Sequence, residues 1–406
     1  MRPRPAYMNI WQELSAEKSM IFVAGPRQSG KTTLAQMVSD AYVNHLYFNW
    51  DIPKDRIRLI ENPFFFENVE RKNGSKPLII FDEIHKYRDW KNYLKGVYDR
   101  FHKEFLFLVS GSGRLDFYQK GGDSLAGRYY LFHLWPFTLG ELFQTGRSMN
   151  DFRNSLLEVV TDRNAEMKAI WSSLETFSGF PEPNLTGRMR SYRRWSGTYS
   201  RQLIREDIRD LTNIKAIGDL ETLYHLLPSK VGSPLSVPSL SRDLKISYNT
   251  IRNWLETFER FFLVFSIRPW TRKVARAIQK ERKIYLWDIP RIADPAARFE
   301  NMVALELYRA VTIWNDTGRG RFTLHFIKNK EQQEVDFIIA DENRPLLLIE
   351  TKLSETKPSS ALVKFQSALN IPAVQLTNKA GGYRLFSAGR QKILVAPAWN
   401  WLAMLP

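Results

Sequence analysis

Residues 25–33 combine residue types that bind a phosphate chain. They follow an apolar run from Met20 to Ala24 and precede a segment, Leu34 to Val38, whose spacing predicts a helix. A loop of the form G-x-x-x-x-G-K-[ST] turns backbone N–H groups toward phosphate, and the helix N-terminus behind it adds positive potential. The sequence therefore predicts a nucleotide site formed by Gly25, Pro26, Arg27, Gln28, Ser29, Gly30, Lys31, Thr32 and Thr33.

Two residues of this loop have specific expected roles, and a second motif complements them. Lys31 is expected to reach the β- and γ-phosphates of ATP, and the Thr32 hydroxyl to ligate Mg²⁺. A second apolar run, residues 77–81, ends in Asp82 and Glu83. We expect Asp82 to hold Mg²⁺ through water and Glu83 to polarise the attacking water as general base. An acidic pair alone often marks a solvent-facing strand end, but the presence of both motifs favours catalysis.

The elements between these motifs predict an α/β fold. Further strands are expected at residues 46–49, 105–110 and 129–134, with helical segments between them. This alternation predicts a doubly wound parallel sheet that binds nucleotide at its carboxyl edge. Ser112 follows the strand at residues 105–110, where a hydroxyl would sense the γ-phosphate or orient water. A simple Ser/Gly turn is the alternative for Ser112.

A separate set of charged residues lies in the last third of the chain. Glu300 is at the start of an apolar helix, Asp336 begins an apolar strand, and Glu350 and Lys352 share one side of the next strand because strand side chains alternate. Glu300, Asp336 and Glu350 are candidate ligands for Mg²⁺ or Mn²⁺, while Lys352 would position or activate water at a phosphate. The alternative is a solvent-facing sheet edge.

Along most of its length the chain resembles prokaryotic ATPases of the AAA+ superfamily that carry a C-terminal domain of unknown function. The resemblance rests on residues 25–33, 81–85 and 110–112, and on Ser124-Leu125-Ala126-Gly127-Arg128 before Trp135-Pro136-Phe137-Thr138. It implies that Arg128 senses the γ-phosphate, or acts as an arginine finger from a neighbouring subunit of a homo-oligomer. A structural salt bridge is the alternative role of Arg128.

The C-terminal domain of that family is similar to the PD-(D/E)xK nuclease core. In this chain the Asp, Glu and Lys positions are filled by Asp336, Glu350 and Lys352, and Val335 stands where the motif has proline. The resemblance thus implies a nuclease-like domain with a metal site.

The middle of the chain is expected to be mostly helical. Residues 141–227 have helical spacing with a Gly/Pro break at 177–183, which predicts a lid or connector. Residues 239–267 predict two short helices joined by a turn and then a strand, as in a winged helix-turn-helix whose second helix contacts DNA, or serves only protein interaction. The predicted domains are 1–140, a P-loop ATPase domain; 141–230, a helical connector; 231–285, the winged-helix-like unit; and 286–406, the nuclease-like domain.

The amino-acid composition indicates which class of partner the chain binds, and it excludes chemistry that requires cysteine. Lys and Arg number 59 against 43 Asp and Glu, a net charge of +16, which favours nucleic acid, and DNA first, although solubility alone is the alternative. Basic residues interleave with aromatic ones near residues 188–201 and 268–283. The chain has no cysteine, which excludes disulfides and thiolate chemistry. Apolar runs are far shorter than the roughly 20 residues of a membrane span, so no membrane association and a cytoplasmic location are expected.

Two functional hypotheses follow from the sequence. In the first, a DNA-binding ATPase uses its nucleotide state to control a metal-dependent nuclease domain. In the second, the same ATPase gates a scaffold that only grips nucleic acid or protein. A small-molecule kinase would leave the basic clusters and the last third of the chain unexplained.

Overall fold

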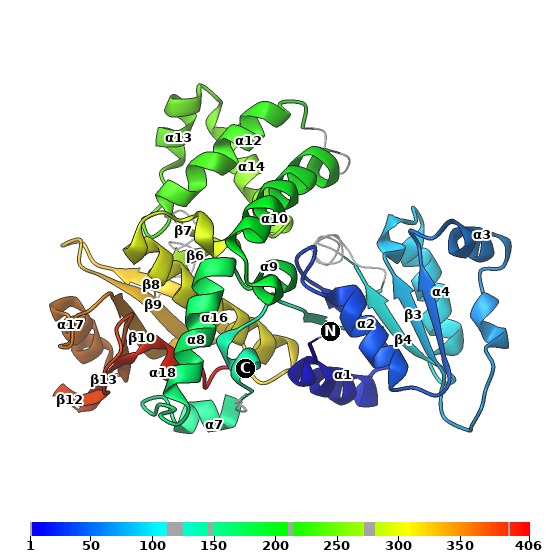
Figure 1. Cartoon of the computed structure of the whole chain (residues 1–406), viewed down its shortest axis with the longest axis horizontal. Helices are drawn as coiled ribbons and strands as arrows, with labels where there is room; N and C mark the ends of the chain where they lie inside the picture. Colours follow the sequence, from blue (N-terminus) through cyan, green and yellow to red (C-terminus); the bar gives the residue numbers. More distant parts are fainter. Residues whose placement is uncertain (1, 112–124, 145–148, 210–213, 272–280, 389) are drawn as a thin grey trace. The chain divides into compact units, whose positions relative to one another are not determined.

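The computed structural model describes residues 2–111, 125–144, 149–209, 214–271, 281–388 and 390–406 (Figure 1). Two compact units make up the chain, Met1–Pro136 and Phe137–Pro406. The boundary between them lies near the end of the predicted ATPase domain. The finer division of residues 141–406 into three domains stays a prediction.

The first unit contains a five-stranded, entirely parallel sheet in the order β2-β3-β4-β1-β5. Apolar side chains fill the central strands, as is typical of a parallel sheet covered on both faces. All five strands occur where the sequence predicts them, which confirms the α/β class. Their bounds are β1 Met20–Ala24, β2 His45–Asn49, β3 Leu78–Asp82, β4 Leu106–Ser110 and β5 Tyr130–His133.

Helices connect the strands of the first unit and enclose its core. A large aromatic cluster, which includes Phe66, Phe81 and Phe107, packs on one face of the sheet. Parallel strands require such crossover helices, because each strand must return to the same edge before the next begins. The helices are α1 Pro5–Glu17, α2 Lys31–Asp40, α3 Pro53–Glu61 and α4 Trp90–Phe101.

The first part of the second unit is helical, as the sequence predicts. Its helices are α6 Leu139–Phe143, α7 Met149–Asn154, α8 Asn164–Phe177, α9 Pro181–Thr186, α10 Met189–Gln202, a π-helical turn at Leu203–Ile208, and α12 Ile217–Leu226. The predicted break at residues 177–183 separates α8 from α9. No helix among those that the structure describes is long and apolar enough to cross a membrane.

Two short helices then meet at a turn, as predicted for residues 239–260. Helix α13 (Val237–Leu244) ends at Lys245 in the left-handed conformation, and α14 (Tyr248–Arg260) begins behind Ser247, whose side chain caps the Thr250 N–H. The strand that follows, β6 (Val264–Pro269), pairs with β7 (Lys283–Leu286) and also with β8 of the C-terminal sheet. This strand is therefore continuous with the C-terminal sheet, and a separate winged-helix unit stays a prediction.

The C-terminal part of the second unit is built on an eight-stranded mixed sheet in the order β12-β13-β11-β10-β9-β8-β6-β7. β9 is antiparallel to both of its neighbours, β8 and β10, and β11 runs parallel to both β10 and β13. The additional strands are β8 Phe322–Lys328, β9 Glu334–Asp341, β10 Arg344–Lys352, β11 Ala373–Thr377, β12 Arg384–Ala388 and β13 Gln391–Pro397.

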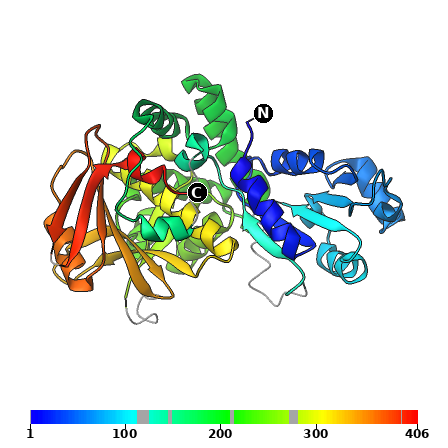
Figure 2. The same cartoon turned by 90° about the horizontal axis from the view of Figure 1, so that it is seen from below.

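Helices α16 (Pro295–Asp316) and α17 (Ser360–Leu369) cover this sheet. Adjacent residues of β9 point to opposite faces: Phe337 lies against Tyr285, whereas Ile338 packs in a cluster with Leu362 of α17. Figure 2 shows the C-terminal strands, drawn orange to red, side by side, with the yellow helix α16 against them. A short helix, α18 (Ala398–Leu402), follows β13.

Candidate functional site

The loop between β1 and α2 has the backbone that a phosphate-binding loop needs. Gly25 has φ +144°, and a Cβ there would lie 2.2 Å from the Leu134 carbonyl oxygen. Gly30 adopts the left-handed conformation with φ +98° immediately before α2 begins at Lys31. Any side chain at Gly25 would force the loop away from β5. The loop therefore holds a shape that leads directly into the N-terminus of α2, where backbone N–H groups favour an anion.

Lys31 and Arg4 secure this loop from two sides. The Lys31 ammonium is buried and donates to the carbonyl oxygens of Gly25 (3.1 Å) and Pro26 (2.6 Å). Arg4 precedes α1 and is 3% exposed; its guanidinium donates to the carbonyl oxygens of Ser29 (2.8 Å) and Trp135 (2.7 Å). Lys31 thus lies inside the loop where phosphates would bind, and Arg4 links the loop to the end of the first unit.

Asp82 is the centre of a hydrogen-bonded cluster at the carboxyl edge of the sheet. Its Oδ2 accepts from the hydroxyls of Thr32 (2.8 Å) and Tyr47 (2.6 Å), and its Oδ1 accepts from the hydroxyl of Ser110. Burial, followed by the charge of Asp82, raises the pKa of Tyr47 far above its usual value, so Tyr47 stays a donor. The Thr32 hydroxyl and the Asp82 carboxylate together provide the oxygen ligands that Mg²⁺ prefers, so these residues fit Mg²⁺.

Glu83 follows Asp82 in a strained conformation. Its φ is +56°, which is uncommon for a residue with a side chain, while its backbone N–H donates to the Ser110 carbonyl. Burial raises the pKa of the Glu83 carboxyl; Lys86, 3.1 Å away, and Lys31 oppose this rise. Such strain often marks functional positions. A partly buried carboxylate with a raised pKa suits a general base.

Two further residues, Ser112 and Arg128, were predicted to belong to this site. Ser112 lies outside the described residues. Arg128 comes just before β5, at the edge of the sheet where strands begin, and forms a two-point ion pair with Asp99 of α4, with Nε–Oδ1 at 2.6 Å. The phosphate-binding loop lies at the other edge. Sensing of the γ-phosphate by Arg128 within its own subunit therefore does not fit this position, and a role toward a neighbouring subunit stays a prediction.

In the second unit, Asp336 and Glu350 come together less directly than the sequence suggests. Asp336 Oδ2 accepts from the N–H (2.8 Å) and the hydroxyl (2.6 Å) of Thr351. Glu350 forms an ion pair of 2.7 Å with Lys352, as expected from their shared side of β10, but its other oxygen reaches only the backbone N–H of Asp336, at 3.4 Å. Burial and the charge of Asp336 raise the pKa of Glu350 to about 8.

Lys283 is the unexpected member of this group. It is the first residue of β7, its side chain is 1% exposed, and its ammonium lies 2.5 Å from Glu334 Oε1, 3.0 Å from Glu300 Oε1 and 3.8 Å from Asp336 Oδ1. Tyr285 donates to the same oxygen of Glu300 at 2.8 Å. Burial and then the charge of Asp336 raise the pKa of Glu300 to about 7, although Lys283 opposes the rise.

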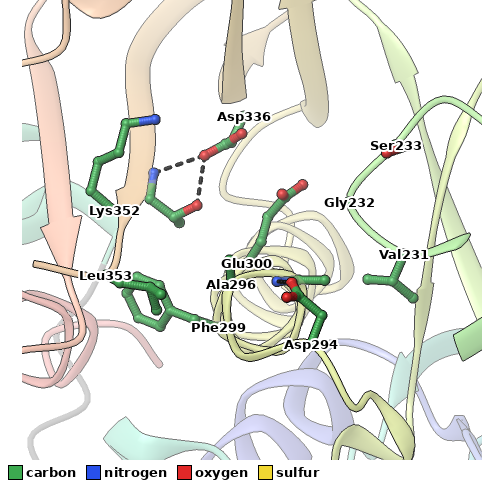
Figure 3. A pocket seen from close by; sticks show the side chains of 12 residues that line it. Val231, Gly232, Ser233, Asp294, Ala296, Phe299, Glu300, Asp336, Lys352 and Leu353 are labelled. Carbon is green, nitrogen blue, oxygen red and sulfur yellow. Dashed lines mark hydrogen bonds between the residues drawn. The ribbon is translucent and has the colours of Figure 1, made fainter. Parts of the chain in front are cut away.

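A pocket of about 310 Å³ opens beside this group. Asp336, Glu300 and Lys352 line it, whereas Glu350 does not (Figure 3). Within the described part of the chain, no three Asp, Glu or His side chains are grouped as a metal ion requires. Glu300, Asp336 and Glu350 therefore do not fit a resident Mg²⁺ or Mn²⁺, because an ammonium lies between two of the carboxylates and the third carboxylate points elsewhere.

The basic residues near 188–201 are separated from the aromatic residues beside them. On α10, Tyr192, Trp195 and Tyr199 are buried: Trp195 and Tyr199 pack against Phe180, with ring centroids 4.8 Å apart for Phe180 and Trp195, and Tyr192 lies beside Trp195. These rings are thus unavailable for stacking on bases, which corrects the expected combination of charge and stacking surface. The exposed face of α10 and its N-cap carry the arginines: Arg188, Arg190, Arg193, Arg194 and Arg201. Most of the second predicted basic cluster, residues 272–280, lies outside the described residues.

Sequence reasoning missed several residues of both sites. Tyr47 and Arg4 contact the nucleotide site only because the fold brings distant strands together, and no local motif indicates them. Ser110 belongs to residues 110–112, on which the family resemblance partly rests. Its position at the end of β4, beside β3, could have indicated its contact with Asp82. Lys283 falls in the basic cluster near residues 268–283 and Thr351 lies between Glu350 and Lys352, but nothing in the sequence indicates their contacts with Asp336.

Comparison with known protein families agrees with this geometry. Residues 17–143 match the family described as an AAA domain. Residues 171–290 and 296–397 match two families described as domains of unknown function, DUF8612 and DUF4143. The first unit is therefore an AAA-type domain with an α/β P-loop NTPase fold. The expected C-terminal domain of unknown function is present, and neither description names a nuclease.

Individual relatives are distant. An uncharacterised protein of Methanocaldococcus jannaschii is 23% identical over 402 residues, which are 93% of this chain and 87% of that protein. An uncharacterised protein of Mycobacterium tuberculosis is 23% identical over 269 residues, 66% of this chain, so the chain spans about half (54%) of that relative.

Two solved structures are distantly similar to this chain. The Walker-type ATPase PABY2304 of Pyrococcus abyssi has 15% identity and a TM-score of 0.46, covering 72% of this chain and 95% of that one. The Aeropyrum pernix ORC1 protein in complex with DNA has 14% identity and a TM-score of 0.35, covering 75% and 93%.

Proposed function

We propose that this chain binds ATP with Mg²⁺ at the loop of residues 25–33 and hydrolyses it. The observation that carries the proposal is the cluster around Asp82, in which Thr32 from the loop meets the carboxylate at the end of β3. The match of residues 17–143 to an AAA domain supports it. The loop N–H groups and Lys31 would bind the phosphates, and Thr32 and Asp82 would hold Mg²⁺, which neutralises charge on the phosphates when bound.

Glu83 is the residue that we assign to the proton transfer. Its carboxylate would accept a proton from the attacking water, and its raised pKa strengthens it as a base at neutral pH. Lys86 lies 3.1 Å from Glu83 and also 2.6 Å from Asp51, so it orients the carboxylate from the solvent side. Glu83 thus has a fixed position and a shifted pKa, the two requirements of a general base.

The test is ATP binding and hydrolysis by the purified chain with Mg²⁺, compared with Lys31→Ala and Glu83→Gln. Lys31→Ala should lose both binding and turnover, because the loop loses its buried cation. Glu83→Gln should bind ATP as the wild type does and hydrolyse it about 100-fold more slowly or worse, since general-base catalysis contributes roughly 10²–10⁴. Lys103→Ala and Glu61→Gln, both at exposed positions, are matched controls. Unchanged turnover in Lys31→Ala would refute the assignment.

The second unit is the candidate for nucleic-acid binding, with DNA first, under control of the nucleotide state. A net charge of +16 and the arginines exposed on α10 support this role. Metal-dependent cleavage at Asp336, Glu350 and Lys352 is the alternative, favoured by their proximity. The position of Lys283 weighs against that alternative, so we propose a binding role for this unit.

Following DNA on a gel during ATP hydrolysis separates the two roles. Binding of duplex or single-stranded DNA that changes the hydrolysis rate, without cutting under Mg²⁺ or Mn²⁺, supports a nucleotide-gated binding protein. Cutting that is lost in Asp336→Ala or Lys352→Ala, with DNA binding retained, would instead establish a nuclease.

A further inference from the structure

The Lys283 ammonium lies within a group of carboxylates, a position that metal cations usually take. Three side chains from two elements converge on its ammonium: Glu300 from α16, and Glu334 and Asp336 from β9. The lysine side chain is 1% exposed, so its charge is withdrawn from water together with theirs. Burying an ammonium is costly unless carboxylates surround it, and burying these carboxylates is costly unless a cation lies among them. The buried ammonium and the carboxylates around it therefore stabilise each other.

The backbone around Lys283 fixes this position. β7 pairs with β6 on one side, and Pro234 forms a bridge to Lys283 on the other. The segment that contains Pro234 also passes over Glu300 at Gly232. Gly232 has φ +82°, and a Cβ there would come within 3.1 Å of Glu300 Oε2. Glu300 is thus covered by the backbone at Gly232 and forms an ion pair with Lys283.

An ammonium and a divalent cation compete for the position among these oxygens. Mg²⁺ and Ca²⁺ bind carboxylate oxygens at about 2.0–2.6 Å, and Lys283 Nζ already lies 2.5 and 3.0 Å from two of them. A metal ion placed centrally among Glu300 Oε1, Glu334 Oε1 and Asp336 Oδ1 would take the position of the ammonium and be repelled by its charge. We propose that Lys283 is a built-in cation that takes the place of a divalent metal among Glu300, Glu334 and Asp336. The adjoining pocket is then expected to hold no metal ion.

This inference does not depend on ATP hydrolysis, and it predicts a gain of function. Lys283→Gln removes the positive charge and keeps most of the volume, so the three carboxylates should become a metal site. The probe is Tb³⁺ titrated into the full-length chain without nucleotide, read as luminescence sensitised by neighbouring Tyr285, which is hydrogen-bonded to Glu300. The wild type should show no saturable signal, and Lys283→Gln should show one.

Thermal unfolding with Mn²⁺ provides an independent measurement. Saturating Mn²⁺ should raise the unfolding midpoint of Lys283→Gln by at least about 3 °C and leave that of the wild type unchanged, because only the variant gains a ligand that binds the folded state. Lys328→Gln is the matched control: Lys328 lies 3.6 Å from Glu334 but is 30% exposed and forms no described ion pair with Glu300 or Asp336. It should gain no metal binding.

Two further variants make the outcome decisive. The gain in Lys283→Gln should disappear when Glu300→Gln is added, which places the metal at these carboxylates. If Lys283→Gln folds and gains no metal binding, the proposal is wrong. Should Lys283→Gln fail to fold, the wild type decides: Mn²⁺ or Tb³⁺ binding that is removed by Glu300→Gln or Asp336→Asn would overturn the proposal, and no binding would support it.

Discussion

The hydroxyl of Thr32 in α2 donates a hydrogen bond of 2.8 Å to the carboxylate of Asp82, although β4 lies between β3, which ends at Asp82, and β1, which leads into the loop before α2. The contact is possible because all strands of the sheet are parallel, so the loops that follow them meet at one edge. Ser110 at the end of β4 fills the gap and also donates to Asp82. Hydroxyls from β2, β4 and α2 thus fix one carboxylate.

Tyr47→Phe should weaken the use of Mg²⁺ while leaving the loop intact. Tyr47 shares Asp82 Oδ2 with Thr32, and a hydrogen bond to a charged group contributes about 1.5–3 kcal/mol. We therefore expect the Mg²⁺ concentration for half-maximal ATP hydrolysis to rise about tenfold, with little change in ATP affinity. Tyr130→Phe, at the opposite edge of the same sheet, is the control. An unchanged Mg²⁺ dependence would show that Tyr47 does not position Asp82.

The elements of the nucleotide site were accessible to sequence reasoning because each is encoded locally. A continuous apolar strand, a glycine-bearing loop and a lysine at the start of a helix occur within residues 20–38, and the second acidic strand repeats the apolar pattern. Tyr47 and Arg4 were not accessible, since their contacts join positions 35 and 131 residues apart. Such contacts depend on strand order, which local patterns do not determine.

The group around Asp336 and Lys283 shows even more clearly that local sequence patterns do not determine tertiary contacts. Helix α16 and strands β9 and β10 were predictable from their periodicity, and so was the shared side of Glu350 and Lys352 on β10. The metal site inferred from these residues did not account for Lys283, because β7 joins the sheet beyond β8 and β6. A short motif defines which charges are available, and the tertiary fold decides which of them meet.

Arg4→Ala should destabilise the first unit and weaken nucleotide binding together. The guanidinium bridges the carbonyl oxygens of Ser29 and Trp135 and lies over the ring of Tyr7, 4.5 Å from its centroid. Removing it leaves two buried carbonyls without these donors, which costs about 2–4 kcal/mol of unfolding free energy. ATP affinity should fall about tenfold, because Ser29 belongs to the loop. Urea unfolding and ATP titration measure both effects.

The exposed residue Arg56 provides the comparison for this variant, since Arg56→Ala removes the same charge from the surface of α3. If Arg4→Ala lowers stability but leaves ATP affinity at the wild-type value, Arg4 only packs the N-terminal helix and does not position the loop.

Glu306 makes the stability of the second unit depend on pH. This buried carboxyl of α16 accepts from the Leu139 N–H and lies 3.9 Å from Arg309, and burial raises its pKa from 4.5 to about 7. The folded state holds the proton more tightly than the unfolded state. The stabilisation is therefore complete below pH 4.5 and is lost as pH rises through 7, at most about 3 kcal/mol.

Glu306→Gln should remove this dependence. The amide keeps an oxygen to accept from Leu139 and cannot ionise, so the variant should gain stability relative to wild type between pH 5 and pH 8. Urea unfolding at several pH values measures the difference, with Glu331→Gln as the exposed control. Equal slopes for wild type and Glu306→Gln would mean that Glu306 titrates near its ordinary value.

The arginine face of α10 leads to a prediction about salt dependence. Arg190, Arg193, Arg194 and Arg201 recur at helical spacing on the exposed side, opposite the buried rings, so a phosphate backbone could contact several of them at once. Each phosphate contact adds about 0.9 to the slope of log affinity against log salt concentration for duplex DNA. Replacing both Arg193 and Arg194 by Glu should therefore lower affinity at least about tenfold and reduce the slope by about 2.

The control for this double variant must carry the same change in net charge. Lys54→Glu with Arg56→Glu provides it at exposed positions of α3 in the first unit. If both double variants weaken DNA binding equally, the attraction comes from the overall charge of the chain. A loss confined to the α10 variant, with the basal rate of ATP hydrolysis unchanged, would place the contact on α10 and leave the nucleotide site independent of it.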